Sequence, residues 1–377
     1  MNRTAKLLKT RRSIPDVPDE PTGDLEDDDG LRPALTEVYR GANPVVDIVA
    51  IHGVNGDAIK TFTTADGKHF WLGDTDMLPR DVKNSRILTY SYPARVATIL
   101  GSTSSDRILQ HAHTLVAELV ADRELDSAVD RPIIFVCHSL GGIIVKRALV
   151  YSASRTGHKI EHLRSIYVST YGILFLGTPH QGSDKANLAR FAQRMVQVFV
   201  PSKLVDTGSA LLDALQTGSE VLQEVNDNFT PLMKEFRIYF FWEQEKTNLG
   251  VTWDYVVTES SAAPILDNTD RAGLRSDHGN LCKFASRNSP GYRLIASTMV
   301  RFLRDAPSVI AQRWNQDRAM LMSKRKNEAE ELYHRTHVFT GTLTHSFGRW
   351  ILSVSVQGST YDFSHVVKVD LEINDKV

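Results

Sequence analysis

Short, uninterrupted apolar runs alternate with helical patterns along most of this chain, and this alternation constrains the fold more than any other feature. The runs are VVDIVAIHG (45–53), SRILTYSYP (85–93), RPIIFVCHS (131–139), YGILFLGTPHQG (171–182), FRIYFFWE (236–243) and WDYVVTESSA (253–262). Helical spacing occupies residues 106–125, 140–153 and 291–305. Strands that are continuously apolar and separated by helices are buried on both faces. We therefore expect an α/β fold with a mostly parallel central sheet and helices on both of its faces.

The flanking regions have a different composition and suggest three further divisions of the chain. Residues 1–40 form an acidic, proline-rich arm that cannot bury enough apolar surface to fold alone, and we expect it to be disordered. Residues 41–305 form the α/β domain. Within it, 183–235 is too long for a simple crossover, so we expect a helical insertion that either covers a site as a lid or packs on one side. Residues 306–377 form a charged helix and β-like segments of unassigned role.

Composition excludes several classes of function. The formal net charge is −1, so no overall field favours nucleic acid as a partner. Two cysteines are too few for a disulfide framework, which favours a reducing compartment. We find neither an apolar stretch long enough for a transmembrane segment nor a secretory signal. We expect a cytoplasmic protein. The alternatives are a mitochondrial protein, because residues 1–13 are basic and free of acids, or a peripheral protein of intracellular membranes.

The stretch IIFVCHSLGG (133–142) carries the clearest chemical signal. An apolar strand, a serine at a turn and an apolar helix follow one another, which is the arrangement that exposes a nucleophilic serine. The usual pattern is Gly-x-Ser-x-Gly, and Cys137 stands at its first glycine. Ser139 is the expected nucleophile. Cys137 lies inside the strand, where burial raises the pKa of a thiol and keeps it inert, so we expect it to be a small packing residue.

A serine nucleophile needs a histidine base, and in enzymes with this turn the chain order is Ser, acid, His. His278 lies in a polar loop after the last expected strand and before the closing helix, which is where a base should reach the serine. His180 precedes the remaining strands and would break the order. His138 is set aside because its side chain should point away from Ser139.

The acid should follow the end of a strand between Ser139 and His278, because it must orient the imidazole. Glu243 ends the run FRIYFFWE and meets this requirement, whereas Asp254 begins the next run. Asp277 and Glu259 remain as alternatives.

Acyl transfer also needs two N–H donors for the developing oxyanion. The backbone N–H of Leu140 follows the serine directly. The second donor should come from IHGVNGD (51–57), where Val54 is the first choice and Asn55 the second. We expect no cofactor and no metal site.

Seven motifs occur in an order that resembles a known family. HGVNGDAIKTFT, FWLGDTDMLP, RILTYSY, FVCHSLGGIIVKRAL, GILFLGTPHQGSD, ESSA and DHGNLCKF together are similar to the serine esterase/lipase-like α/β-hydrolases. The resemblance covers roughly residues 44–305. It is strongest to the N-terminal hydrolase domain of fungal NACHT/NLR-type proteins and to the serine-active-site-containing phospholipid-remodelling proteins, and more distant to GPI inositol-deacylase.

The resemblance implies the α/β-hydrolase fold, a triad of Ser139, Glu243 and His278, and ester or lipid substrates. We therefore expect a serine hydrolase (carboxylesterase/lipase-like) acting on acyl esters, with peripheral membrane association left open. The alternative is a signalling or interaction module of a fungal immune-receptor-like system that uses the hydrolase fold as a scaffold. Residues after 305 contain no Gly-x-x-x-x-Gly-Lys-Ser/Thr phosphate loop, so we expect a stand-alone hydrolase or a truncated relative with a divergent tail.

Overall fold

The computed structural model describes most of the chain between residues 34 and 363. The described ranges are 34–94, 104–180, 190–198 without 192 and 196, 220–250, 252–335, 341–346, 349–356 and 359–363. The expected disordered arm falls outside these ranges up to residue 33. Its last residues do not fit that expectation, because residues 35–40 form a strand of the central sheet.

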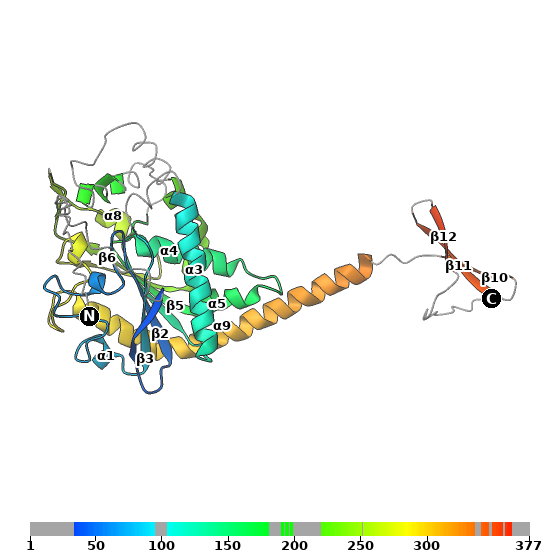
Figure 1. Ribbon diagram of the computed structural model, residues 1–377, viewed down its shortest axis with the longest axis horizontal. Coiled ribbons are helices and arrows are strands. Elements are labelled where there is room, and N and C mark those ends of the chain that lie inside the picture. Colours follow the sequence, from blue (N-terminus) through cyan, green and yellow to red (C-terminus); the bar gives the residue numbers. More distant parts are fainter. Residues whose placement is uncertain are drawn as a thin grey trace, which may run out of the picture.

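A seven-stranded sheet forms the centre of the molecule (Figure 1). Its spatial order is β1-β3-β2-β4-β5-β6-β9. The first strand, β1, pairs antiparallel with β3, and every other pair is parallel. The strands are β1 (Leu35–Arg40), β2 (Val46–Ile51), β3 (Ser85–Tyr90), β4 (Ile133–His138), β5 (Thr170–Leu176), β6 (Arg237–Glu243) and β9 (Thr269–Leu274). The expected α/β architecture, with a mostly parallel central sheet and helices on both of its faces, is confirmed.

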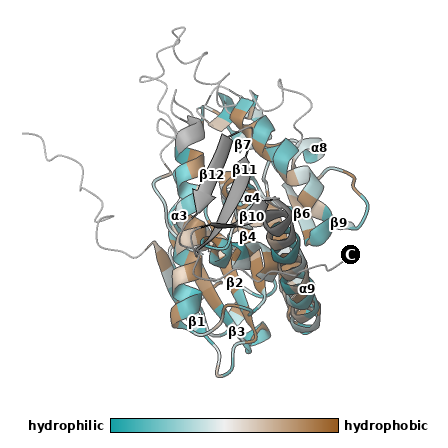
Figure 2. Cartoon of the chain, turned by 90° about the vertical axis from the view of Figure 1, so that its right-hand side faces the viewer, coloured by the Kyte–Doolittle hydropathy of each residue, from teal (hydrophilic) through white to brown (hydrophobic). Residues whose placement is uncertain are grey.

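Helices cover both faces of the sheet, as the apolar strands require. One face packs against α3 (Ser104–Leu125), α4 (Leu140–Ala153) and α5 (Ser165–Ser169). The other packs against α1 (Leu78–Asp81) and α9 (Tyr292–Arg335). Hydrophobic colour is concentrated on the central strands, and hydrophilic colour on the outer surfaces of the helices (Figure 2). Alternate residues of β4 therefore face opposite layers: Phe135 and Cys137 face α3 and α4, and Val136 faces the α9 layer.

A buried ion cluster fixes the end of β2 farthest from the serine turn. Asp47 is fully buried and accepts hydrogen bonds from Arg86 at 3.0 Å and from Arg131 at 2.9 Å. Arg123, also buried, pairs with the same carboxylate. A buried carboxylate is tolerated only when it is paired and hydrogen-bonded in this way.

Two sequence expectations at the far edge of the sheet are wrong. The run 253–262 is not one strand: Trp253–Asp254 forms the short strand β8, which pairs with β7 (Thr247–Asn248), and Glu259–Ala262 forms helix α8. The last sheet strand is instead β9, with the sequence TDRAGL. It lies at the edge and is only partly buried, so it carries no apolar run that would have revealed it.

The closing helix is longer than expected, and the proposed boundary between residues 305 and 306 falls inside it. Helix α9 runs from Tyr292 to Arg335 through Pro307 and extends away from the sheet (Figure 1). Its middle is held against the sheet and α5: Arg313 donates to the carbonyl of Thr170 at 2.5 Å, and Trp314 Nε1 donates to Ser169 Oγ at 3.1 Å. Pro307 does not end the helix, although a proline in a helix interior usually kinks or breaks it.

The expected helical insertion lies partly outside the described residues. Within the described part, residues 220–229 are helical (the 220–229 helix) and lead through a 3-10 turn, Thr230–Glu235, into β6. At the other end of the chain, β10 (Gly341–Ser346), β11 (Arg349–Val356) and β12 (Ser359–Phe363) form an antiparallel three-stranded sheet. In the part of the chain that the structure describes, no helix combines the length and apolar character needed to cross a membrane.

Candidate active site

The turn between β4 and α4 holds Ser139 in a strained backbone conformation. Its φ is 50° and its ψ is −121°, a region that side-chain-bearing residues rarely adopt. The N–H of Ser139 donates to the carbonyl of Leu176 at 2.9 Å, which ties the turn to the end of β5. Strain of this kind persists only where neighbouring structure enforces it, and a sharp strand–turn–helix is the geometry that lifts a serine out of a sheet.

Two glycines after the serine allow the backbone to pass close to its neighbours. A Cβ at Gly141 would lie 2.5 Å from the carbonyl oxygen of His52, and a Cβ at Gly142 would lie 2.3 Å from Thr178 Oγ1. Both distances are too short for any side chain, so the start of α4 is wedged between the segment after β2 and the segment after β5.

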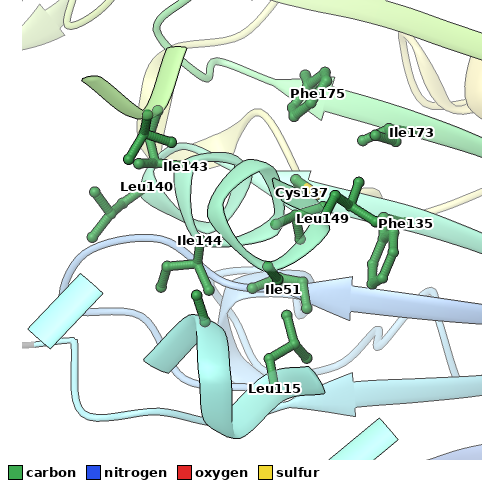
Figure 3. Close-up of a cluster of buried hydrophobic side chains, with 14 of the residues drawn as sticks. Ile51, Leu115, Phe135, Cys137, Leu140, Ile143, Ile144, Leu149, Ile173 and Phe175 are labelled. Carbon is green, nitrogen blue, oxygen red and sulfur yellow. The ribbon is translucent and has the colours of Figure 1, made fainter. Parts of the chain in front are cut away.

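Cys137 occupies the position where the usual motif has its first glycine. It is fully buried on the α3–α4 face, among Ile51, Phe135 and Leu149 (Figure 3). Burial raises the pKa of its thiol well above the ordinary value, which suppresses the reactive thiolate. The expectation that Cys137 is a buried packing residue agrees with this environment.

The imidazole of His278 lies beside Ser139, although the two residues are 139 positions apart in the sequence. His278 begins the 3-10 turn His278–Asn280 that follows β9, and its Nε2 lies 3.0 Å from Ser139 Oγ. Its Nδ1 lies 2.5 Å from Glu243 Oε2. All three side chains are buried, with 2% or less of each residue exposed.

Glu243, the last residue of β6, is held by backbone donors on its other oxygen. Oε1 accepts hydrogen bonds from the N–H of Val256 and, at 3.1 Å, from that of Val257. A carboxylate oxygen accepts a hydrogen bond from a ring N–H, so the contact with Glu243 suits the tautomer that carries its proton on Nδ1. In that tautomer Nε2 accepts the hydroxyl hydrogen of Ser139.

The alternative acids have other partners. Asp277 caps the His278–Asn280 turn, and its Oδ1 accepts from the backbone N–H of Asn280 at 2.9 Å. Glu259 begins α8 and pairs with Arg271 at 2.7 Å. Within the described residues, neither carboxylate forms a hydrogen bond with the imidazole of His278. His180, the alternative base, packs its ring against Phe175 and Phe240. Among the described residues, it forms no hydrogen bond with Ser139.

The segment after β2 lies directly against the serine. A Cβ at Gly53 would lie 2.9 Å from Ser139 Cβ. The N–H of Asn55 donates to the carbonyl of Ala94 at 2.7 Å, whereas the N–H groups of Val54 and Leu140 donate to no acceptor among the described residues. Val54 is thus the better placed of the two candidates for the second donor.

Tyr92 anchors this segment. Its hydroxyl donates to the carbonyl of His52 at 2.8 Å, and its ring stacks on the His52 imidazole with centroids 4.3 Å apart. These contacts hold the segment beside the serine turn, and donors held in place beforehand stabilise a developing charge most effectively.

Two residues that no sequence pattern indicated, His138 and Thr178, contact this group. His138 Nε2 donates to the backbone carbonyl of His278 at 3.0 Å, and burial together with the nearby imidazole of His278 lowers the pKa of His138 to about 3. Thr178 Oγ1 donates to the carbonyl of Ser139 at 2.8 Å. Alternation along β4 shows that His138 faces away from Cys137, but only the folded structure shows that His278 lies on that face.

No metal-binding cluster accompanies the site in the described ranges. Within them, no group of three or more His, Cys, Asp or Glu side chains is arranged to hold a metal ion. The chemistry available to this arrangement is that of a hydroxyl, an imidazole and a carboxylate in series.

Comparisons with known proteins match this chain to one described family and to several curated relatives. The sequence profile of the family described as "Putative serine esterase (DUF676)" matches residues 48–236, half of the chain. Protein SERAC1 of Bos taurus is 26% identical over 286 residues, and SERAC1 of Danio rerio is 26% identical over 275 residues. These alignments cover 71% and 69% of this chain and 40% and 39% of the relatives, so the chain spans about two fifths of the length of these curated relatives.

Among solved structures, the Bacillus licheniformis lipase BlEst2 in its mature form aligns with a TM-score of 0.46 and 18% identity. The alignment covers 71% of this chain and 97% of that one. The curated relatives named here are animal proteins, and the resemblance to fungal NACHT/NLR-type proteins stays a prediction from the sequence.

Proposed function

This chain belongs to the serine esterase family DUF676, and from that premise we propose that it hydrolyses acyl esters through a triad of Ser139, His278 and Glu243. One observation carries the proposal: the unbroken series from Ser139 Oγ to His278 Nε2 at 3.0 Å and from His278 Nδ1 to Glu243 Oε2 at 2.5 Å. A free serine hydroxyl is a weak nucleophile, and an adjacent oriented base is what activates it.

In the first half of the reaction, Ser139 Oγ attacks the ester carbonyl and transfers its proton to His278 Nε2. The carboxylate of Glu243 stabilises the imidazolium that forms and does not itself take up the proton. The N–H groups of Leu140 and Val54 hold the oxyanion of the tetrahedral intermediate, and removal of one such donor typically costs about 3–4 kcal/mol of activation free energy. The imidazolium then protonates the departing alkoxide, leaving an acyl group on Ser139.

In the second half, water replaces the alcohol. His278 Nε2 accepts a proton from the water as its oxygen attacks the acyl carbonyl, and the same proton is returned to Ser139 Oγ as the ester to the enzyme breaks. The products are a carboxylic acid and the regenerated serine, and no cofactor enters the balance.

Lipid esters are the substrates we favour within the acyl-ester class. The support is the sequence resemblance to lipase-like hydrolases and the apolar character of the 183–235 insertion, in which Phe191 and Met195 are buried. We place the protein in the cytoplasm, with mitochondrial or peripheral membrane locations as alternatives. The two free, buried cysteines suit a reducing compartment.

The direct test is hydrolysis of p-nitrophenyl esters of increasing acyl length by the purified full chain. Wild type should release p-nitrophenol, and Ser139→Ala should not. Ser154→Ala, at the C-terminal end of the same helix, serves as the matched control and should behave as wild type. A preference for long acyl chains supports a lipid substrate, and a preference for acetate contradicts that part of the proposal. A wild type with a native circular dichroism spectrum but no turnover on any ester would favour the alternative of a signalling scaffold.

A further inference from the structure

Lys146 is buried in α4 although the triad does not use it. It is 1% exposed, and its Nζ donates to Asn226 Oδ1 at 2.6 Å and to the carbonyl of Pro179 at 3.3 Å. The same ammonium group lies 5.4 Å from the centre of the Phe175 ring. Within the described residues, no carboxylate forms an ion pair with it, and burial lowers its pKa well below the ordinary value. A buried amine held only by neutral acceptors is a costly way to stabilise a core.

The carbonyl that Lys146 holds belongs to a segment in contact with both ends of the proposed proton relay. This segment, Gly177–His180, follows β5. Its Thr178 hydroxyl donates to the carbonyl of Ser139 at 2.8 Å. On the other side, a Cβ at Gly177 would lie 3.0 Å from Cε1 of His278. A displacement of the Gly177–His180 segment would therefore move the serine turn and the imidazole relative to each other.

The second partner of Lys146 lies on the insertion. Asn226 belongs to the 220–229 helix, is 4% exposed, and presents its Oδ1 to the ammonium group. Leu222, Val225 and Phe229 of this helix are buried in the same core cluster as α4. Lys146 thus joins three elements: the nucleophile helix, the Gly177–His180 segment and the helix that ends the insertion.

We propose that Lys146 is a positioning residue, which locks the Gly177–His180 segment to the docked 220–229 helix and so sets the Ser139–His278 geometry. This inference rests on the hydrolase function proposed above. It also explains why a lysine occupies this buried position. An apolar side chain would stabilise the fold more, but only a long side chain with an N–H donor at its end can reach both Asn226 Oδ1 and the carbonyl of Pro179.

Lys146→Met is the informative substitution, because methionine fills a similar volume and lacks the donor. We expect an unchanged or higher melting temperature, since a buried polar group without a counter-charge is replaced by an apolar side chain of similar volume. We expect kcat to fall about 10- to 100-fold, the range for a small misplacement of reacting groups, with a much smaller change in KM. Lys234→Met, at an exposed lysine of the same insertion, is the control and should match wild type in both measurements.

Two Asn226 variants separate positioning from simple packing. Asn226→Asp keeps the acceptor and adds a counter-charge, so it should retain wild-type kcat. Asn226→Leu removes the acceptor and should lower kcat as Lys146→Met does. The variant that combines Lys146→Met with Asn226→Leu should have a kcat no lower than that of either single variant. Additive losses would contradict the shared contact.

Other outcomes overturn the inference without touching the proposed function. An active wild type with an equally active Lys146→Met shows that Lys146 does not position the relay. A fall in melting temperature parallel to the loss of kcat shows an ordinary structural role. A wild type without esterase activity would instead refute the hydrolase function itself, on which this inference depends.

Discussion

Replacing Glu243 by glutamine should abolish most of the activity through the tautomer of His278, with little effect on the fold. The glutamine amide has one oxygen and one NH2 group in place of two acceptors. The N–H groups of Val256 and Val257 both point at one oxygen of the side chain, so the amide oxygen stays with them. The NH2 group then faces His278 Nδ1, which lies 2.5 Å from that position in the native protein. Nδ1 must accept and Nε2 must carry the proton, so the imidazole cannot deprotonate Ser139.

The size of the effect follows from this change of role. An isosteric amide at the acid of a serine triad lowers kcat by about 10⁴ because the imidazole is in the wrong tautomer. That factor corresponds to about 5 kcal/mol of activation free energy. Since the glutamine side chain still accepts the two backbone hydrogen bonds from Val256 and Val257, we expect a much smaller change in the free energy of unfolding.

The assay compares kcat for a chromogenic ester with the midpoint of urea unfolding for wild type and variant. Glu245→Gln is the matched control, because Glu245 lies two residues away with its side chain 54% exposed, and it should retain wild-type kcat. Full activity in Glu243→Gln would refute the role of Glu243 and move the acid to Asp277 or Glu259. A collapse of stability with the same kcat loss would refute the tautomer explanation.

Three further predictions concern the surroundings of the triad. Gly142→Ala should lower kcat/KM about 10- to 100-fold, because the added Cβ would lie 2.3 Å from Thr178 Oγ1. Gly157→Ala is the control and should keep wild-type kcat/KM, because its Cβ would be no closer than 3.7 Å to any neighbour. Equal activities of the two variants would contradict the close packing at Gly142. Iodoacetamide at mildly alkaline pH should leave the native enzyme active, since burial raises the pKa of the Cys137 thiol; inactivation with a label on Cys137 would show the thiol to be accessible. His138→Gln should lose stability less steeply than wild type on acidification, by about 1.4 kcal/mol per pH unit between about pH 6 and pH 4. The pKa of native His138 is lowered from 6.5 to about 3, so in this range the unfolded state binds the extra proton and wild-type stability falls as the pH falls; parallel urea midpoints of the two proteins across this range would contradict it.

The fold could be predicted where burial leaves a signal in the sequence. Strands β2 to β6 of the central sheet are buried on most of their length, so their apolar runs marked them to within a few residues. Strand β9 escaped because it is an edge strand with a polar sequence. The run 253–262 resembled a strand because it contains the buried residues Val256 and Val257. These residues are buried in the turn whose N–H groups bind Glu243, and this turn is not part of a strand.

The candidate site could be assembled from chain order and strand ends, which is why Ser139, Glu243 and His278 were named together. Their catalytic roles are still predictions. What the sequence could not supply are contacts between residues that topology alone brings together. His138 meets the carbonyl of His278 across 140 positions, and Lys146 meets Asn226 across 80. Neither contact has a periodicity or a motif, because each depends on the tertiary placement of a polar group.

Covalent labelling of the full chain by a fluorophosphonate, followed by intact mass and peptide mapping, tests the central claim most directly. The reagent reacts with a serine only when a base and oxyanion donors activate it. We expect one adduct per wild-type chain, located on Ser139, with no adduct in Ser139→Ala and slow labelling in Glu243→Gln. A natively folded wild type that stays unlabelled, or a Ser139→Ala variant that labels as fast as wild type, would contradict the account.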